Sequence, residues 1–187
     1  MKRIGVLALQ GAVSEHLSQI DHLGHQPIAV TKPDQLAHID ALILPGGEST
    51  TIYHLLETRG FMPVVTQWLK QQRPVFATCA GMIILSRFSA SQLEAKVVRN
   101  GFGRQIASFE TKVTLQLGNG ERTVPAVFIR APYYETVGPD VQIMARYDDK
   151  IVAIETTHLI ACAFHPELTP DTQLLAYFID TKVSALS

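Results

Sequence analysis

A short apolar strand, a cysteine and the start of a helix follow one another in the stretch Pro74-Val75-Phe76-Ala77-Thr78-Cys79-Ala80-Gly81. The run at residues 74–77 predicts a strand, and the apolar residues at 80–85 predict the helix behind it. A direct turn from strand to helix is tight, and small residues let the backbone make it. The stretch therefore predicts one strand–helix unit of an α/β protein, with Cys79 at the end of the strand.

The residues before this unit repeat the same alternation. Strands are predicted at residues 4–9, 26–30 and 41–44. Helices are predicted at residues 12–23 and 61–71, and a further helix begins at Ser49 or Thr50. Residues 33–39 form a connector with some helical character. Ser49 or Thr50 is expected to cap the second helix, because hydroxyl side chains favour that position. Such alternation predicts a mostly parallel sheet with helices on both faces.

The second half of the chain has a different pattern. Strands are predicted at residues 109–117, 124–129, 141–147, 151–155 and 159–164, a surface loop at 87–96, and a last helix from Thr169-Pro170 to about residue 182. Turn signals such as Gly118-Asn119-Gly120 indicate antiparallel hairpins attached to the sheet. The fold expected is three-layer α/β, with a mostly parallel open sheet, helices on both faces and an antiparallel extension in the second half.

Length and composition limit the classes of protein. The 187 residues, 47% of them hydrophobic, suit one compact domain spanning 1–187. A net charge of −1 implies no strongly basic face, so no nucleic-acid or membrane partner is expected. The apolar run near the N-terminus is too short for a signal peptide or a membrane span, which favours a cytoplasmic protein with free thiols. No metal or cofactor is expected, because the histidines lack ligand spacing.

Cys79 is the first candidate for chemistry, because sites in parallel α/β sheets form at the carboxyl ends of strands. The positive end of the following helix favours a thiolate, which is the nucleophilic form of cysteine. The alternative is a small buried core residue, which is the usual fate of a free cysteine and our interpretation of Cys162.

Two further strand ends carry candidate residues. His165 and Glu167 would point to the same side of an extended segment, so Glu167 could hold one ring nitrogen and leave the other for a thiol. The alternative is a surface His–Glu pair. Gly46-Gly47 offers N–H groups that could bind an oxyanion or a phosphate, or could form an ordinary turn. Arg99 and Arg130 suit carboxylate recognition or a surface salt bridge.

Together these segments resemble the class I glutamine amidotransferases, which carry a Cys–His–Glu triad on an open α/β sheet. Six blocks are similar to one branch, the glutaminase subunits of pyridoxal 5′-phosphate synthase, in the right order along nearly the whole chain. They are Leu9-Gln10-Gly11-Ala12, Leu44-Pro45-Gly46-Gly47-Glu48-Ser49-Thr50-Thr51, Thr78-Cys79-Ala80-Gly81, Arg99-Asn100-Gly101-Phe102-Gly103-Arg104-Gln105, Phe128-Ile129-Arg130-Ala131-Pro132 and Phe164-His165-Pro166-Glu167-Leu168.

The resemblance implies that the chain hydrolyses L-glutamine to glutamate and ammonia. Cys79 would attack the side-chain amide, His165 would shuttle the proton and Glu167 would hold His165. Gly47 and Ala80 would form the oxyanion hole, and the glutamine contacts would be Gly47, Glu48, Ser49, Arg99, Ile129 and Arg130. The resemblance further implies that ammonia passes to a separate barrel-shaped synthase subunit in a large hetero-oligomer, and that activity is poor until that partner docks.

Two departures from this branch stand out. Ala77 occupies a position where the family often has glycine, and residues 86–98 are short compared with family members. Neither departure touches the triad. Two alternatives stay open: the glutaminase of another class I pathway, and a non-catalytic relative that keeps the turn cysteine. The Gly-Glu-Ser-Thr-Thr block argues against the first alternative, and the presence of His165 and Glu167 argues against the second.

Overall fold

A nine-stranded sheet forms the centre of the computed structural model, which describes residues 1–103, 105 and 107–184. Arg104, part of one block named above, lies outside the described residues. The spatial order is β2 (Gln26–Val30), β1 (Arg3–Leu7), β3 (Ala41–Leu44), β4 (Val75–Thr78), β11 (Leu159–Cys162), β10 (Lys150–Glu155), β8 (Tyr133–Val137) and β5 (Ala95–Val98), with β9 (Gln142–Tyr147) paired to β10. The first five strands of this spatial order, which end with β11, pair in parallel. The remaining pairs in this sheet are antiparallel.

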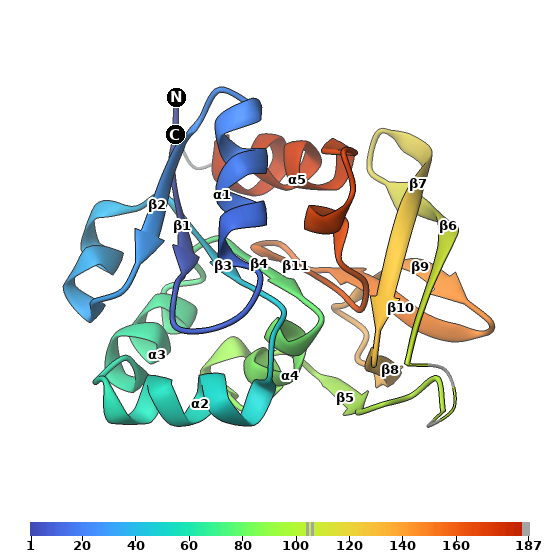
Figure 1. Cartoon of the computed structure of the whole chain (residues 1–187), viewed down its shortest axis with the longest axis horizontal. Helices are drawn as coiled ribbons and strands as arrows, with labels where there is room; N and C mark the ends of the chain where they lie inside the picture. The colour runs from blue at the N-terminus through green and yellow to red at the C-terminus, as the bar shows by residue number, and fades with distance from the viewer. Residues whose placement is uncertain (104, 106, 185–187) are drawn as a thin grey trace.

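Helices cover both faces of the parallel part, as the alternation predicts. Figure 1 shows α1 (Val13–His22) and α5 (Gln173–Phe178) on one face, and α2 (Ser49–Thr58), α3 (Met62–Lys70) and α4 (Ala80–Ser86) on the other. Strands β3, β4 and β11 are buried along their whole length, which explains their uninterrupted apolar sequences. The predicted three-layer α/β fold is confirmed.

The predicted hairpins are also present. Strands β9 and β10 extend the central sheet, whereas β6 (Ser108–Leu117) and β7 (Gly120–Ile129) form a separate two-stranded sheet beside it. The ring of Phe109 stacks on that of Phe128 at 4.7 Å and contacts Tyr147 of β9 at 5.4 Å. Aromatic packing therefore holds this hairpin against the sheet, where its last residues reach the carboxyl ends of the parallel strands.

Two predicted boundaries are wrong. Residues 87–96, predicted as a surface loop, contain the 3-10 helix Ser89–Ser91 and the first residues of β5. In addition, the sequence pattern gives no prediction of strand β8. The last helix begins at Gln173 rather than at Thr169-Pro170, because the Asp171 carboxylate accepts the Gln173 N–H at 2.9 Å. A π-helix, Ile179–Val183, continues it. No helix within the described ranges is long and apolar enough to cross a membrane.

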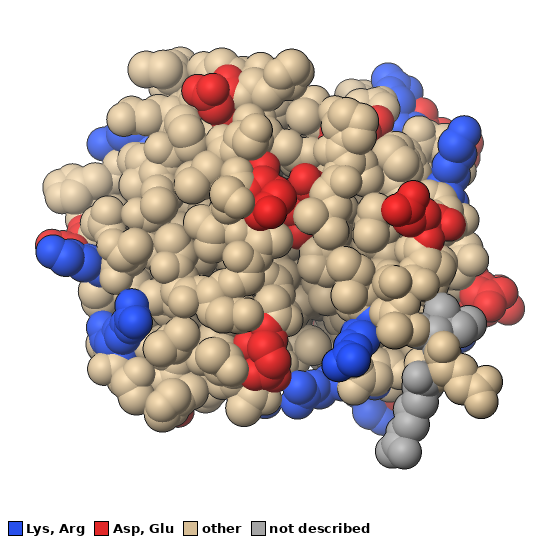
Figure 2. Space-filling model, viewed as in Figure 1, with Lys and Arg blue, Asp and Glu red and all other residues tan. Residues whose placement is uncertain are grey.

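Charged side chains are spread thinly over one face of the molecule. On the face seen in Figure 2, acidic and basic residues are interspersed and most of the surface is neither. This face therefore offers no single-signed field of the kind that attracts polyanions.

Glu48, and not Ser49 or Thr50, caps α2. Its carboxylate accepts the N–H groups of Thr50 (3.1 Å) and Thr51 (2.7 Å), so the predicted hydroxyl cap is wrong. Hydrogen bonds from the hydroxyl and N–H of Thr51, and then from Thr50, lower the pKa of Glu48 from 4.5 to about 2. A carboxylate also suits the positive end of the helix dipole, where a hydroxyl brings no charge.

Removal of this cap is expected to destabilise the protein modestly. Glu48→Ala should lower the free energy of unfolding by about 1 kcal/mol at neutral pH, the usual cost of a lost N-cap. Because folding lowers the pKa of Glu48, its contribution to stability is present above pH 4.5 and is lost as the pH falls towards 2. Urea unfolding between pH 3 and 7 measures it, with Glu57→Ala at the other end of α2 as control. Equal losses at all pH values would contradict this account.

Candidate active site

Three chain segments meet at one edge of the sheet because their strands are neighbours. Strand β4 lies between β3 and β11 and pairs in parallel with both, so all three carboxyl ends open on the same side. A cleft of about 600 Å³ lies there, within the usual size of ligand pockets. It is lined by all the candidate site residues except Glu167, namely Gly47, Glu48, Ser49, Cys79, Ala80, Arg99, Ile129, Arg130 and His165.

Cys79 occupies a strained turn between β4 and α4. Its backbone has φ 48° and ψ −108°, a conformation that L-residues rarely adopt, and its N–H donates to Cys162 O at 2.8 Å. A Cβ on Gly81 would lie 2.1 Å from Leu44 O, so only glycine allows α4 to approach β3 this closely. The turn aims the Cys79 side chain at the cleft, with Sγ 3.7 Å from Ile129 O.

His165 and Glu167 form the expected hydrogen bond. His165 Nδ1 lies 2.7 Å from Glu167 Oε1, and the Glu167 side chain is fully buried. The predicted extended geometry is wrong, because Pro166–Leu168 is a 3-10 turn, and this turn brings the Glu167 carboxylate to His165 Nδ1. The His165 N–H donates to Val127 O of β7 at 2.8 Å, which ties this turn to the hairpin.

Electrostatics in the cleft favour a protonated His165. Burial alone lowers the pKa of His165, but hydrogen bonds to Cys79 and Glu167 and the charge of Glu167 outweigh it and raise the pKa to about 10. For Glu167, burial raises the pKa, but the hydrogen bond from His165 and the nearby imidazoles lower it below its ordinary value. The arrangement can therefore accept a thiol proton on His165 and stabilise it there.

The two glycines after β3 have separate roles in this geometry. A Cβ on Gly46 would lie 2.4 Å from His165 Cε1 and 3.4 Å from Cys79 Cβ, so this position has no room for a side chain. A Cβ on Gly47 would meet the side-chain oxygen of Gln10, which accepts the Glu48 N–H at 2.8 Å. The sequence pattern predicts N–H groups or an ordinary turn at this pair, but it gives no indication of the contact between Gly47 and Gln10.

Two arginines from the second half of the chain form a positive wall of the cleft. Arg99 follows β5 and donates to Ser49 Oγ at 3.1 Å, while Arg130 follows β7 with φ 44°. Both arginines line the cleft, and so does the acidic Glu48, so the cleft offers charges of both signs. Cys162, by contrast, is fully buried in β11, as its interpretation as a core residue requires, and burial raises the pKa of its thiol.

A strained cysteine, a buried His–Glu pair and two closely packed glycines thus lie together at one edge of the sheet. A solved structure described as a glutamine amidotransferase has the same fold, with a TM-score of 0.87 and 39% identity, covering 95% of this chain and 97% of that one. The fold is therefore that of a glutamine amidotransferase.

Within that class, the chain belongs to the SNO glutamine amidotransferase family, which matches residues 6–184. Two similar relatives are named pyridoxal 5′-phosphate synthase subunit PdxT. The one from Brevibacillus brevis is 46% identical and the one from Niallia circulans is 45% identical. In both cases the similarity covers 95% of this chain and 96% of the relative.

Proposed function

We propose that this chain is the glutaminase subunit of pyridoxal 5′-phosphate synthase and hydrolyses L-glutamine through Cys79, His165 and Glu167. The observation that carries the proposal is that Cys79 and His165 share the glycine-lined cleft, with the buried Glu167 hydrogen-bonded to His165. Near-full-length similarity to relatives named as subunits of that synthase supports the choice of pathway. Residues 1–187 would act as one cytoplasmic glutaminase domain without a cofactor or metal.

The reaction begins when Cys79 Sγ attacks the side-chain amide carbon of glutamine. The thiol proton passes to His165 Nε2, the nitrogen that the Glu167 hydrogen bond leaves free. The amide oxygen becomes an oxyanion, which the N–H groups of Gly47 and Ala80 would stabilise. Ala80 is the first residue of α4, so its N–H has no acceptor within the helix.

Collapse of this intermediate releases ammonia and leaves a thioester on Cys79. His165 supplies the proton to the leaving nitrogen, then removes a proton from the water that attacks the thioester carbon. Breakdown of the second intermediate releases glutamate and returns the proton to the thiolate. Throughout, the α-carboxylate of glutamine would pair with Arg99 and Arg130, and its ammonium group with Glu48, beside Ser49 and Ile129.

The rim of the cleft supports a protein partner that covers it. Leu168 is 42% exposed and Ile129 is 39% exposed, and both line the cleft. With Met1, they are the large hydrophobic residues that lie exposed in the described part of the chain. Free ammonia is mostly protonated at neutral pH and then not nucleophilic, so a covered route has a purpose. The partner proposed is a barrel-shaped synthase subunit in a large hetero-oligomer.

Addition of the purified synthase subunit is expected to raise glutaminase turnover about tenfold or more, since docking would complete the site. The measurement is glutamate release with and without the partner, and an unrelated barrel protein serves as control. Leu168→Asp should weaken co-purification, because it places a charge on the apolar rim. Full turnover by the isolated chain would show that glutaminase activity does not depend on a partner.

The same experiment separates the remaining alternatives. A glutaminase of another class I pathway would be activated by a different synthase and not by this one. A non-catalytic relative would release no ammonia with any partner. The short hydrogen bond between His165 and the buried Glu167 argues against the latter, because it orients a base in the same cleft as Cys79.

A further inference from the structure

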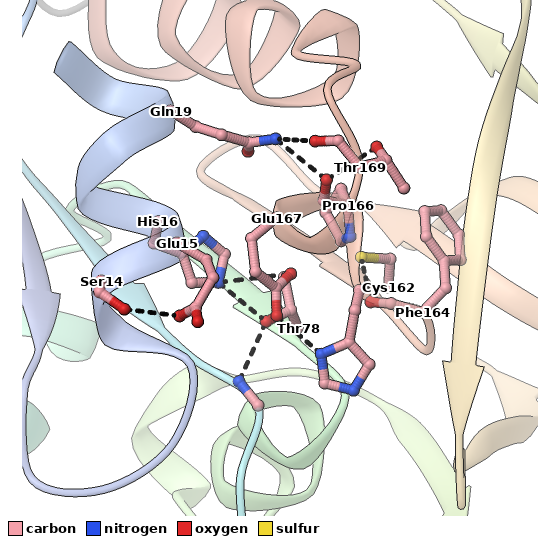
Figure 3. A network of polar contacts seen from close by, with 12 residues as sticks. Ser14, Glu15, His16, Gln19, Thr78, Cys162, Phe164, Pro166, Glu167 and Thr169 are labelled. Carbon is pink, nitrogen blue, oxygen red and sulfur yellow. Dashed lines mark hydrogen bonds and ion pairs between the residues drawn. The ribbon is translucent and has the colours of Figure 1, made fainter. Parts of the chain in front are cut away.

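A second buried histidine lies behind the triad and has no part in the mechanism above. His16 is on α1, fully buried, with its ring edge-on to Phe76 at 6.3 Å. Its Nε2 lies 3.2 Å from Thr78 Oγ1 and 3.6 Å from Glu167 Oε2. Figure 3 shows His16 directed at both residues from the helix side. Burial of a histidine beside a carboxylate costs free energy where their polar atoms stay unpaired, as His16 Nδ1 and Glu167 Oε2 do here.

The surroundings of His16 determine which ring nitrogen carries the proton. Burial, the dominant influence, lowers the pKa of His16, so the ring is neutral at physiological pH. Nδ1 has no hydrogen-bond partner, whereas Nε2 faces two oxygens. A proton on Nδ1 would leave a buried donor unpaired and would point the Nε2 lone pair at a carboxylate. The geometry therefore assigns the proton to Nε2, which donates to Thr78 Oγ1.

The same N–H presents its positive end to Glu167 Oε2. This oxygen has no hydrogen-bond partner, while the other oxygen of the carboxylate bonds to His165. At 3.6 Å the contact with His16 is an electrostatic one and not a hydrogen bond. Inside the protein such a contact is weakly screened, so it favours the ionised carboxylate in this orientation.

Helix α1 holds the Glu167 turn at a second point. Gln19, three residues after His16 and so on the same helix face, donates to Pro166 O and Thr169 O, each at 3.0 Å. Thr78 extends the chain of contacts in the other direction, because its Oγ1 accepts the Gly46 N–H at 3.1 Å. His16 thus connects the turn that carries Glu167 to the glycine segment at the end of β3.

We propose that His16 is a positioning residue of the glutaminase site: it holds Glu167 ionised and correctly oriented, and through Glu167 it fixes His165. The inference rests on the triad proposed above. The other titratable groups near His16 and Glu167 are Glu15 on α1, His165 after β11 and Cys162 in β11, and Cys79 at the end of β4 acts on His165. His16 differs from these groups in being a neutral donor that faces Oε2 of Glu167.

Three variants of His16 test the proposal in the complex with the synthase partner. His16→Gln keeps an N–H at the reach of Nε2 and should retain kcat within about twofold. His16→Leu keeps the bulk of the side chain but has no N–H. His16→Asn has an N–H, but its side chain is too short to bring it to Thr78 Oγ1. Both should lower kcat about 10- to 100-fold with little change in KM, because His165 is no longer held in place. Ile20→Ala, a fully buried change on the same helix, is the control for lost stability and should leave kcat unchanged.

The pH profile separates positioning from stability. With Glu167 less firmly ionised, the pKa of His165 should fall from about 10, so the alkaline limb of kcat/KM should move about one unit lower in His16→Leu. His16→Gln and Ile20→Ala should keep the wild-type limb. A wild-type profile in His16→Leu, or equal behaviour of His16→Gln and His16→Asn, would overturn the proposal.

Alkylation of Cys79 by iodoacetamide gives a readout that does not require glutamine turnover. His16→Leu should slow the reaction at neutral pH several-fold, because a poorly held His165 stabilises the thiolate less. His16→Gln should not, and unchanged alkylation in His16→Leu would count against the proposal. If the wild-type complex released no ammonia while alkylation still depended on His16, the proposed function would fail and the positioning role would stand.

Discussion

Replacement of Cys79 by alanine is expected to lower kcat for glutamine hydrolysis by at least about a thousandfold, since no other group can form the thioester. Cys79→Ser should be nearly as inactive, because a hydroxyl is a much weaker nucleophile than a thiolate at neutral pH. The strained φ of 48° at Cys79 indicates a position held for its side chain and not for packing. Both variants should fold, because the side chain lies at the cleft edge and not in the centre of the core.

The other cysteine supplies the matched control. Cys162 is fully buried in β11, and its Sγ is 3.4 Å from Phe164 O. Cys162→Ala should leave kcat near the wild-type value. A glutamine analogue that reacts with thiols should add one mass equivalent, mapped by peptide mass spectrometry to Cys79. Label on Cys162, or ammonia release that persists in Cys79→Ala, would show that the nucleophile lies elsewhere.

The convergence of the site could be predicted from the sequence because it depends on topology alone. Apolar runs that end in Gly46-Gly47, Cys79 and His165 are parallel strands, and parallel strands open their carboxyl ends to one side. No tertiary contact has to be known for that step. The cap of α2 could not be found in this way, since Glu48 competes with two hydroxyl residues that each have a high capping preference.

Contacts behind the site were beyond the reach of sequence patterns. His16 lies on a helix 62 residues from Thr78, and a single histidine on a helix is usually a surface or core residue. Likewise β8 has only five residues, and part of it is exposed, which leaves no clear apolar pattern. Such features depend on which elements become neighbours, and the spacing of residues within one element does not contain that information.

Gly46→Ala is expected to lower kcat about 100-fold or more, because it forces His165 out of place. The new Cβ would lie 2.4 Å from His165 Cε1 and 2.9 Å from Nδ1, far inside van der Waals contact. The ring cannot yield cheaply, since Nδ1 is held by Glu167 at 2.7 Å and the other ring nitrogen serves Cys79. A displacement of about 1 Å in a catalytic group is enough for a loss of that size.

Gly5→Ala is the matched control for this steric effect. Its Cβ would lie 2.5 Å from Ile39 Cδ1 and 2.8 Å from Val30 Cγ2, a similar overlap in the core away from the cleft. It should lower the midpoint of thermal unfolding but leave kcat of the folded protein unchanged. Activity and unfolding are to be measured on both variants in the same buffer. If Gly46→Ala kept wild-type kcat, close contact between the glycine and His165 would not be what holds the triad together. If it lost activity only in proportion to unfolded protein, the effect would be on stability, and the steric role of Gly46 at the active site would be wrong.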